Sequence, residues 1–72
     1  MEPHIFTTEI SVEDGDFAGH MTRMRLWLDR NRLEPAVFRY DHVGPGVVIR
    51  VDFSIETEAA AFAKEFGGEL RR

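Results

Sequence analysis

The sequence predicts an α+β fold in which a small antiparallel sheet carries two helices on one face. Three observations predict it: stretches of alternating apolar and polar residues, two stretches with apolar residues every three or four positions, and glycine- or proline-containing turns between them. The alternation gives each strand one apolar and one polar face, which is typical of antiparallel sheets with one solvated side. The expected order is β-α-β-β-α, followed by a short final strand or a frayed tail.

Three strands are expected at residues 5–12, 36–43 and 47–55, because β-branched and aromatic residues alternate there with polar ones. In the second strand, the even-numbered residues from Ala36 to His42 should face the helices. The third strand has the most regular apolar face. Its members are Val47, Ile49, Val51, Phe53 and Ile55.

The first helix is expected to follow the turn Glu13-Asp14-Gly15-Asp16, whose carboxylates can cap free backbone N–H groups. It should end by Glu34, since Pro35 disfavours helical geometry in the residue before it. Its apolar stripe consists of Phe17, Met21, Met24 and Leu28. The second helix is expected at residues 56–66, with Gly67-Gly68 ending it in a left-handed conformation.

Right-handed crossovers and a tight hairpin favour the split β-α-β arrangement of the ferredoxin-like fold, with strand order 4-1-3-2. This is a fold analogy, and it implies no activity. At 72 residues the chain is expected to form a single domain, 1–72. Such a small domain buries only about 60% of the surface its unfolded chain exposes, so a partner subunit would add needed stability.

The hairpin Gly44-Pro45-Gly46 predicts a register for the second and third strands. Proline followed by glycine is typical of a type II turn over residues 44–47. Arg39 would then lie opposite Asp52, and Asp41 opposite Arg50, so that both pairs join opposite charges.

Composition excludes several classes of site. The chain has no cysteine, which excludes disulfides, thiolate metal ligands and a cysteine nucleophile. No apolar run approaches the ~20 residues that span a bilayer, and the N-terminus shows no secretory signal, so a cytoplasmic protein is expected. No catalytic residues are evident, because Asp41 and His42 are adjacent in a strand and point to opposite faces. No cofactor-binding loop is recognised either.

The polar face of the expected sheet concentrates charge. Two arginines among carboxylates could hold an anionic ligand or a partner's charges, or they could simply neutralise one another. The residues on this face are Glu9, Arg39, Asp41, Arg50 and Asp52.

One pole of the expected fold gathers two histidines and two aspartates, His20, His42, Asp14 and Asp16. Imidazole and carboxylate groups together suit zinc or another divalent ion. A small-ligand or metal-binding domain is therefore one alternative function. His4 should lie at the opposite pole.

Protein association is the other candidate function. The net charge of −4 and the lack of aromatic residues on the polar face argue against nucleic-acid binding. The second strand should lie at a sheet edge, where free N–H and C=O groups invite pairing. Candidate interface residues are Phe38, Tyr40, Trp27 and exposed Leu26. The expected function is a small cytoplasmic interaction module that forms a homodimer or binds another protein.

Overall fold

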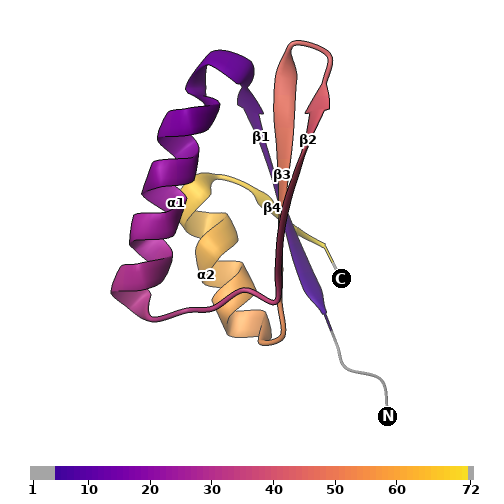
Figure 1. Ribbon diagram of the computed structural model, residues 1–72. Helices are drawn as coiled ribbons and strands as arrows, with labels where there is room; N and C mark the ends of the chain where they lie inside the picture. Colours follow the sequence, from indigo (N-terminus) through magenta and orange to yellow (C-terminus); the bar gives the residue numbers. More distant parts are fainter. Residues whose placement is uncertain (1–4, 72) are drawn as a thin grey trace.

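A computed structural model of the 72-residue chain describes residues 5–71 (Figure 1). It confirms the α+β class, with a four-stranded antiparallel sheet and two helices. The strands lie in the order β2-β3-β1-β4, which read from the other edge is the order expected from the sequence. The elements are β1 (Phe6–Glu13), the 3₁₀ helix η1 (Asp14–Asp16), α1 (Phe17–Asn31), β2 (Val37–Val43), β3 (Gly46–Phe53), α2 (Glu56–Phe66) and β4 (Glu69–Arg71).

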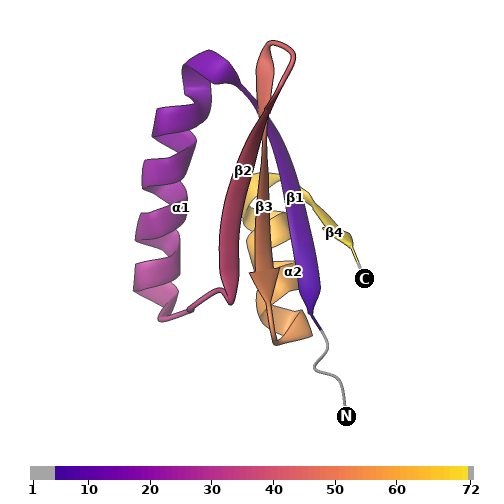
Figure 2. The ribbon, with the colours of Figure 1, turned by 45° about the vertical axis from the view of Figure 1, so that its right-hand side comes forward.

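Both helices lie on the same side of the sheet, as two views of the ribbon show (Figure 1, Figure 2). The core lies between the helices and the sheet. Its main contributor is β3, whose Val47, Ile49, Val51 and Phe53 are all buried. Phe62 of α2 packs on Phe53, with ring centroids 5.4 Å apart. The predicted sorting of apolar and polar residues on β3 is therefore confirmed as far as Phe53.

Thr8 is a polar residue within this core. It is fully buried in the middle of β1, and its hydroxyl donates a hydrogen bond to the Val51 carbonyl oxygen at 2.9 Å. A buried hydroxyl without such a partner would be destabilising. The bond therefore allows a threonine on the side of β1 that otherwise carries the apolar residues Phe6, Ile10 and Val12.

The bounds of α1 agree with the prediction, but the capping at its two ends differs from it. No side chain caps its first turn; instead η1 runs directly into the helix, and Asp16 has helical rather than extended dihedral angles. Its carboxylate therefore lacks the geometry of an N-cap. The helix ends at Asn31, because Arg32 adopts a left-handed conformation with φ 54° and ψ 43°. Leu33 then donates its N–H to the Leu28 carbonyl, which completes the turn.

The second helix has the predicted bounds, but Ile55, predicted on the apolar face of the third strand, does not reach the core. Ile55 is 50% exposed rather than buried, because β3 ends at Phe53 and Ile55 is the extended residue that precedes α2. At the other end Gly67 has φ 67°, as predicted, and Gly68 donates to the Ala63 carbonyl at 2.8 Å. No helix within residues 5–71 is long and apolar enough to cross a membrane.

The hairpin register differs from the prediction by two residues. Val43 pairs with Gly46, and Arg39 lies opposite Arg50, so Gly44 and Pro45 alone form the loop. Gly44 has φ 59°. A glycine with positive φ before proline fits a type II′ turn, whose twist matches that of paired strands, whereas a type II turn splays them. The turn is also held by a hydrogen bond from the Asp14 N–H to the Pro45 carbonyl.

The C-terminal residues do form a strand. β4 pairs with residues 7–9 of β1, which places Gly68 directly against the β1 backbone. A Cβ atom on Gly68 would lie 2.7 Å from the Glu9 carbonyl oxygen and would overlap Ile10 Cγ1. Glycine is thus required by close packing here. His4, predicted at the pole opposite the histidines and aspartates, lies outside the described residues.

We expect Gly68→Ala to lower the free energy of unfolding by about 1–3 kcal/mol, because the added methyl group overpacks the contact with β1. Urea denaturation followed by circular dichroism measures this change. Gly19→Ala on the exposed side of α1 is the control, since a Cβ atom on Gly19 would meet nothing within 4 Å. It should raise stability by about 1 kcal/mol or less through helix propensity. Equal midpoints for the two variants would contradict the packing argument.

Candidate interaction surface

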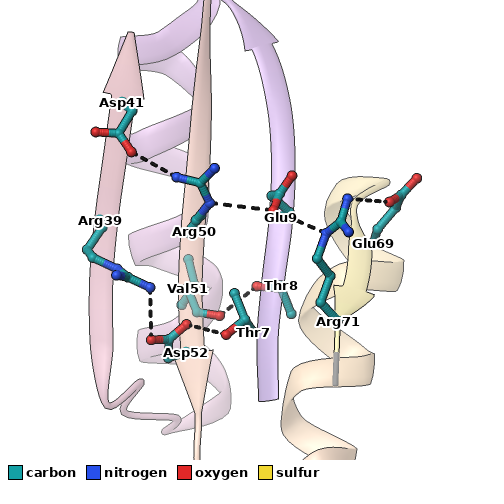
Figure 3. Close-up of polar contacts among 10 residues, drawn as sticks. All are labelled: Thr7, Thr8, Glu9, Arg39, Asp41, Arg50, Val51, Asp52, Glu69 and Arg71. Atoms are coloured by element: carbon teal, nitrogen blue, oxygen red, sulfur yellow. Dashed lines mark hydrogen bonds and ion pairs between the residues drawn. The ribbon is translucent and has the colours of Figure 1, made fainter. Parts of the chain in front are cut away.

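The polar face of the sheet carries a row of alternating charges that crosses all four strands (Figure 3). Arg50 is at its centre: Nη1 lies 2.8 Å from Asp41 on β2, and Nε lies 3.4 Å from Glu9 on β1. Glu9 is in turn 3.1 Å from Arg71 on β4, and Arg71 is 3.5 Å from Glu69. The side chains thus join each strand to its neighbour by opposite charges.

Asp52 is the most enclosed charge on this face. Its side chain is only 10% exposed, although it points away from the helices. One carboxylate oxygen accepts a hydrogen bond from the Thr7 hydroxyl at 2.8 Å, and the other lies 3.2 Å from the Arg39 guanidinium. Both oxygens therefore have partners, which a carboxylate with so little access to water requires.

The predicted pairs Arg39–Asp52 and Asp41–Arg50 both form, but across the diagonal. In the observed register Arg39 lies opposite Arg50, and Asp41 lies opposite Val48. Diagonal neighbours on a sheet are near enough for long side chains to meet. All five predicted face residues are thereby brought together. Since each arginine among them already has a carboxylate partner, the arrangement favours mutual neutralisation over anion binding.

The predicted histidine and aspartate cluster is only partly assembled. His42 Nδ1 lies 3.5 Å from Asp14 Oδ1. His20, by contrast, lies against the Arg23 guanidinium at 3.1 Å, one turn along α1. No group of three or more histidine, aspartate or glutamate side chains within residues 5–71 is arranged to hold a metal ion. The arrangement therefore gives no support to a metal centre at this pole.

β2 is the least covered element of the sheet. Within residues 5–71, nothing pairs with its outer edge, and none of the buried side chains belongs to it. Val37, Tyr40 and Val43 keep 43%, 49% and 57% of their surface exposed. The expectation that Phe38, Tyr40 and His42 line the core is met only by Phe38, which packs partly against it. Tyr40 contacts the Phe17 ring at the rim, with centroids 4.8 Å apart.

A groove of ≈ 590 Å³ lies between β2 and α1. It explains why Tyr40 remains exposed, since α1 does not close over the edge strand. Its lining combines apolar side chains with one arginine and two acids. The lining residues are Met21, Arg25, Leu28, Asp29, Leu33, Glu34, Pro35, Phe38 and Tyr40.

The four predicted interface residues fall into two groups. Phe38 and Tyr40 line the groove beside β2, whereas Leu26 and Trp27 line a separate cleft of ≈ 340 Å³ between α1 and α2. Trp27 packs edge-on against Phe62 and Phe66 at 5.6 Å and 5.9 Å. It therefore serves the core more than a shared surface with Tyr40. Leu26 is half exposed, as expected.

Sequence reasoning did not identify Val37 and Val43 as interface candidates. Both lie at the ends of β2 on the polar face, and their exposure follows from the position of the strand at the edge.

Comparison of the chain with protein-family models, with curated proteins and with solved structures finds no match. The geometry of the chain itself therefore carries the functional argument.

Asp52→Ala should lower the free energy of unfolding by about 1–3 kcal/mol, because the enclosed carboxylate accepts a charged and a neutral hydrogen bond. Asp41→Ala is the matched control, since Asp41 also pairs with an arginine but is 65% exposed. It should cost less than about 1 kcal/mol. Chemical denaturation of both variants measures the difference. A larger loss for Asp41→Ala would contradict the assignment of Asp52 as the anchoring charge.

Proposed function

We propose that this chain is a small protein-interaction module that self-associates through the edge strand β2. The observation that carries the proposal is the exposed apolar surface of a strand whose outer edge has no partner within residues 5–71: Val37, Tyr40 and Val43 are all 43% exposed or more. A strand of this kind can gain both main-chain hydrogen bonds and apolar contact from a second strand.

The hairpin register identifies the backbone groups that are free to pair. Val43 and Gly46 flank a two-residue loop and form a hydrogen-bonded pair. Bonded and non-bonded positions alternate along an antiparallel pair. Residues 37, 39, 41 and 43 therefore direct their N–H and C=O groups toward β3. Phe38, Tyr40 and His42 direct theirs toward the open edge, where a partner strand would satisfy them.

The composition of β2 also supports this use of the edge. Edge strands that avoid association are often very short or interrupted by lysine, proline or a bulge. β2 has seven residues, contains neither lysine nor proline, and pairs with β3 residue for residue. The opposite edge is less suitable, because β4 has only three residues.

The proposal also includes the fold analogy and the setting. The antiparallel order β2-β3-β1-β4 and the position of both helices on one face support a ferredoxin-like topology. That arrangement leaves β2 uncovered, as association requires. A cytoplasmic location, expected from the sequence, remains part of the proposal.

The proposal predicts that the chain elutes with twice its 8.3 kDa mass at high micromolar concentration. His42→Pro should shift it to a monomer, because proline removes one N–H from the open edge and none from the β2–β3 ladder. Light scattering after size exclusion gives both masses, and circular dichroism verifies the fold. His42→Ala is the control: it loses the same imidazole, keeps the N–H, and should remain dimeric. A monomeric wild-type chain would rule out self-association.

A further inference from the structure

The residues of β2 form a self-complementary series. In order they are Val37, Phe38, Arg39, Tyr40, Asp41, His42 and Val43. Tyr40 is the midpoint, and positions equidistant from it match: valine with valine, an aromatic ring with an imidazole, and arginine with aspartate. An antiparallel pair of identical strands places such equidistant positions opposite each other when its two-fold axis passes through the midpoint.

We propose that two copies of this chain join their β2 strands antiparallel about a two-fold axis at Tyr40, forming one continuous eight-stranded sheet (two of the observed four-stranded sheets). This inference rests on the proposed self-association and specifies its geometry. Tyr40 then pairs with the partner's Tyr40, and Phe38 with the partner's His42. These are the residues whose backbone groups face the open edge, so the hydrogen-bonding positions of the two strands coincide.

The outer face of the same pairing joins opposite charges. Arg39 lies opposite the partner's Asp41 on both sides of the axis, and Val37 lies opposite the partner's Val43. The groups needed are accessible: Arg39 is 56% exposed and uses one terminal nitrogen on Asp52, while Asp41 uses one oxygen on Arg50. Both side chains point to the same face of β2 (Figure 3). The row of alternating charges would thus continue from one subunit into the other.

Charge also selects this register over its neighbours. A shift of one residue opposes bonded to non-bonded backbone positions and turns side chains to the wrong face. A shift of two residues restores the backbone match, but it places Arg39 opposite the partner's Arg39, or Asp41 opposite the partner's Asp41. Like charges directly opposite each other are destabilising. The register centred on Tyr40 is the one that places opposite charges directly across from each other and valine across from valine. The shifted registers would depend on diagonal charge pairs, as Arg39 and Arg50 do within the subunit.

Cysteine cross-linking tests the register, because the natural chain contains no cysteine. Val37→Cys and Val43→Cys chains are mixed in equal amounts, one of them labelled with ¹⁵N, and oxidised with glutathione disulfide, which takes up the two electrons. Both positions are exposed and outside the ion pairs, so each variant should keep the wild-type fold. In the proposed register the two cysteines lie directly opposite each other, at a position where the facing backbones do not exchange hydrogen bonds. Their Cα atoms are then about 4.5 Å apart, which is within disulfide range.

The mixed disulfide should exceed the disulfide between two copies of either variant at least about tenfold in mass spectra. In a dimer of one variant, the two identical thiols would lie about 20 Å apart across the axis. A mixture of Ser11→Cys and Val43→Cys chains measures cross-linking by random collision. If the wild-type mass is dimeric but the mixed disulfide is not enriched over this control, the register is wrong while self-association stands. If the wild-type mass is monomeric and cross-linking stays at the control rate, both proposals fail.

Discussion

The pairing of β1 with β3 over eight residues is the contact on which the rest of the structure depends. These central strands provide Ile10, Val47, Ile49, Val51 and Phe53, which both helices cover. A domain of this size has too little apolar surface to enclose every strand equally. Burial is therefore concentrated at the centre of the sheet, and β2 is bonded to β3 on one side and uncovered on the other. The exposed edge is a consequence of how the limited core is distributed.

The polar face strengthens the same centre. Arg50 of β3 and Glu9 of β1 lie directly opposite each other, and each also reaches a charge on an outer strand, Asp41 or Arg71. Exposed pairs of this kind contribute little individually. The β2–β3 ladder even places Arg39 opposite Arg50, and each arginine finds its carboxylate on the diagonal. Asp52 differs because it is enclosed, and its bonds to Thr7 and Arg39 tie three strands at one point. The row of charges thus links neighbouring strands without determining their register.

Much of the fold is predictable from the sequence because alternation is strong in β3, helical spacing is strong in α2, and both elements supply fully buried side chains such as Phe53 and Phe62. The hairpin register is not, since Pro45-Gly46 fits a type II turn locally while strand twist favours the loop Gly44-Pro45. Both registers allow the same ion pairs, directly or diagonally, so charge could not discriminate between them. The exposure of Tyr40 could not be predicted from the sequence either, because it depends on how far α1 extends over β2 rather than on any residue of β2. The separation of His20 from His42 has the same origin: it depends on the orientation of α1.

The central claim is that β2 offers its outer backbone edge to a second copy. Amide hydrogen exchange measured at increasing protein concentration tests it most directly. The account predicts that the N–H groups of Phe38, Tyr40 and His42 become more protected as concentration rises, while those of Arg39 and Asp41, already bonded to β3, change little. Exchange at Phe38, Tyr40 and His42 that stays fast and independent of concentration would contradict the account.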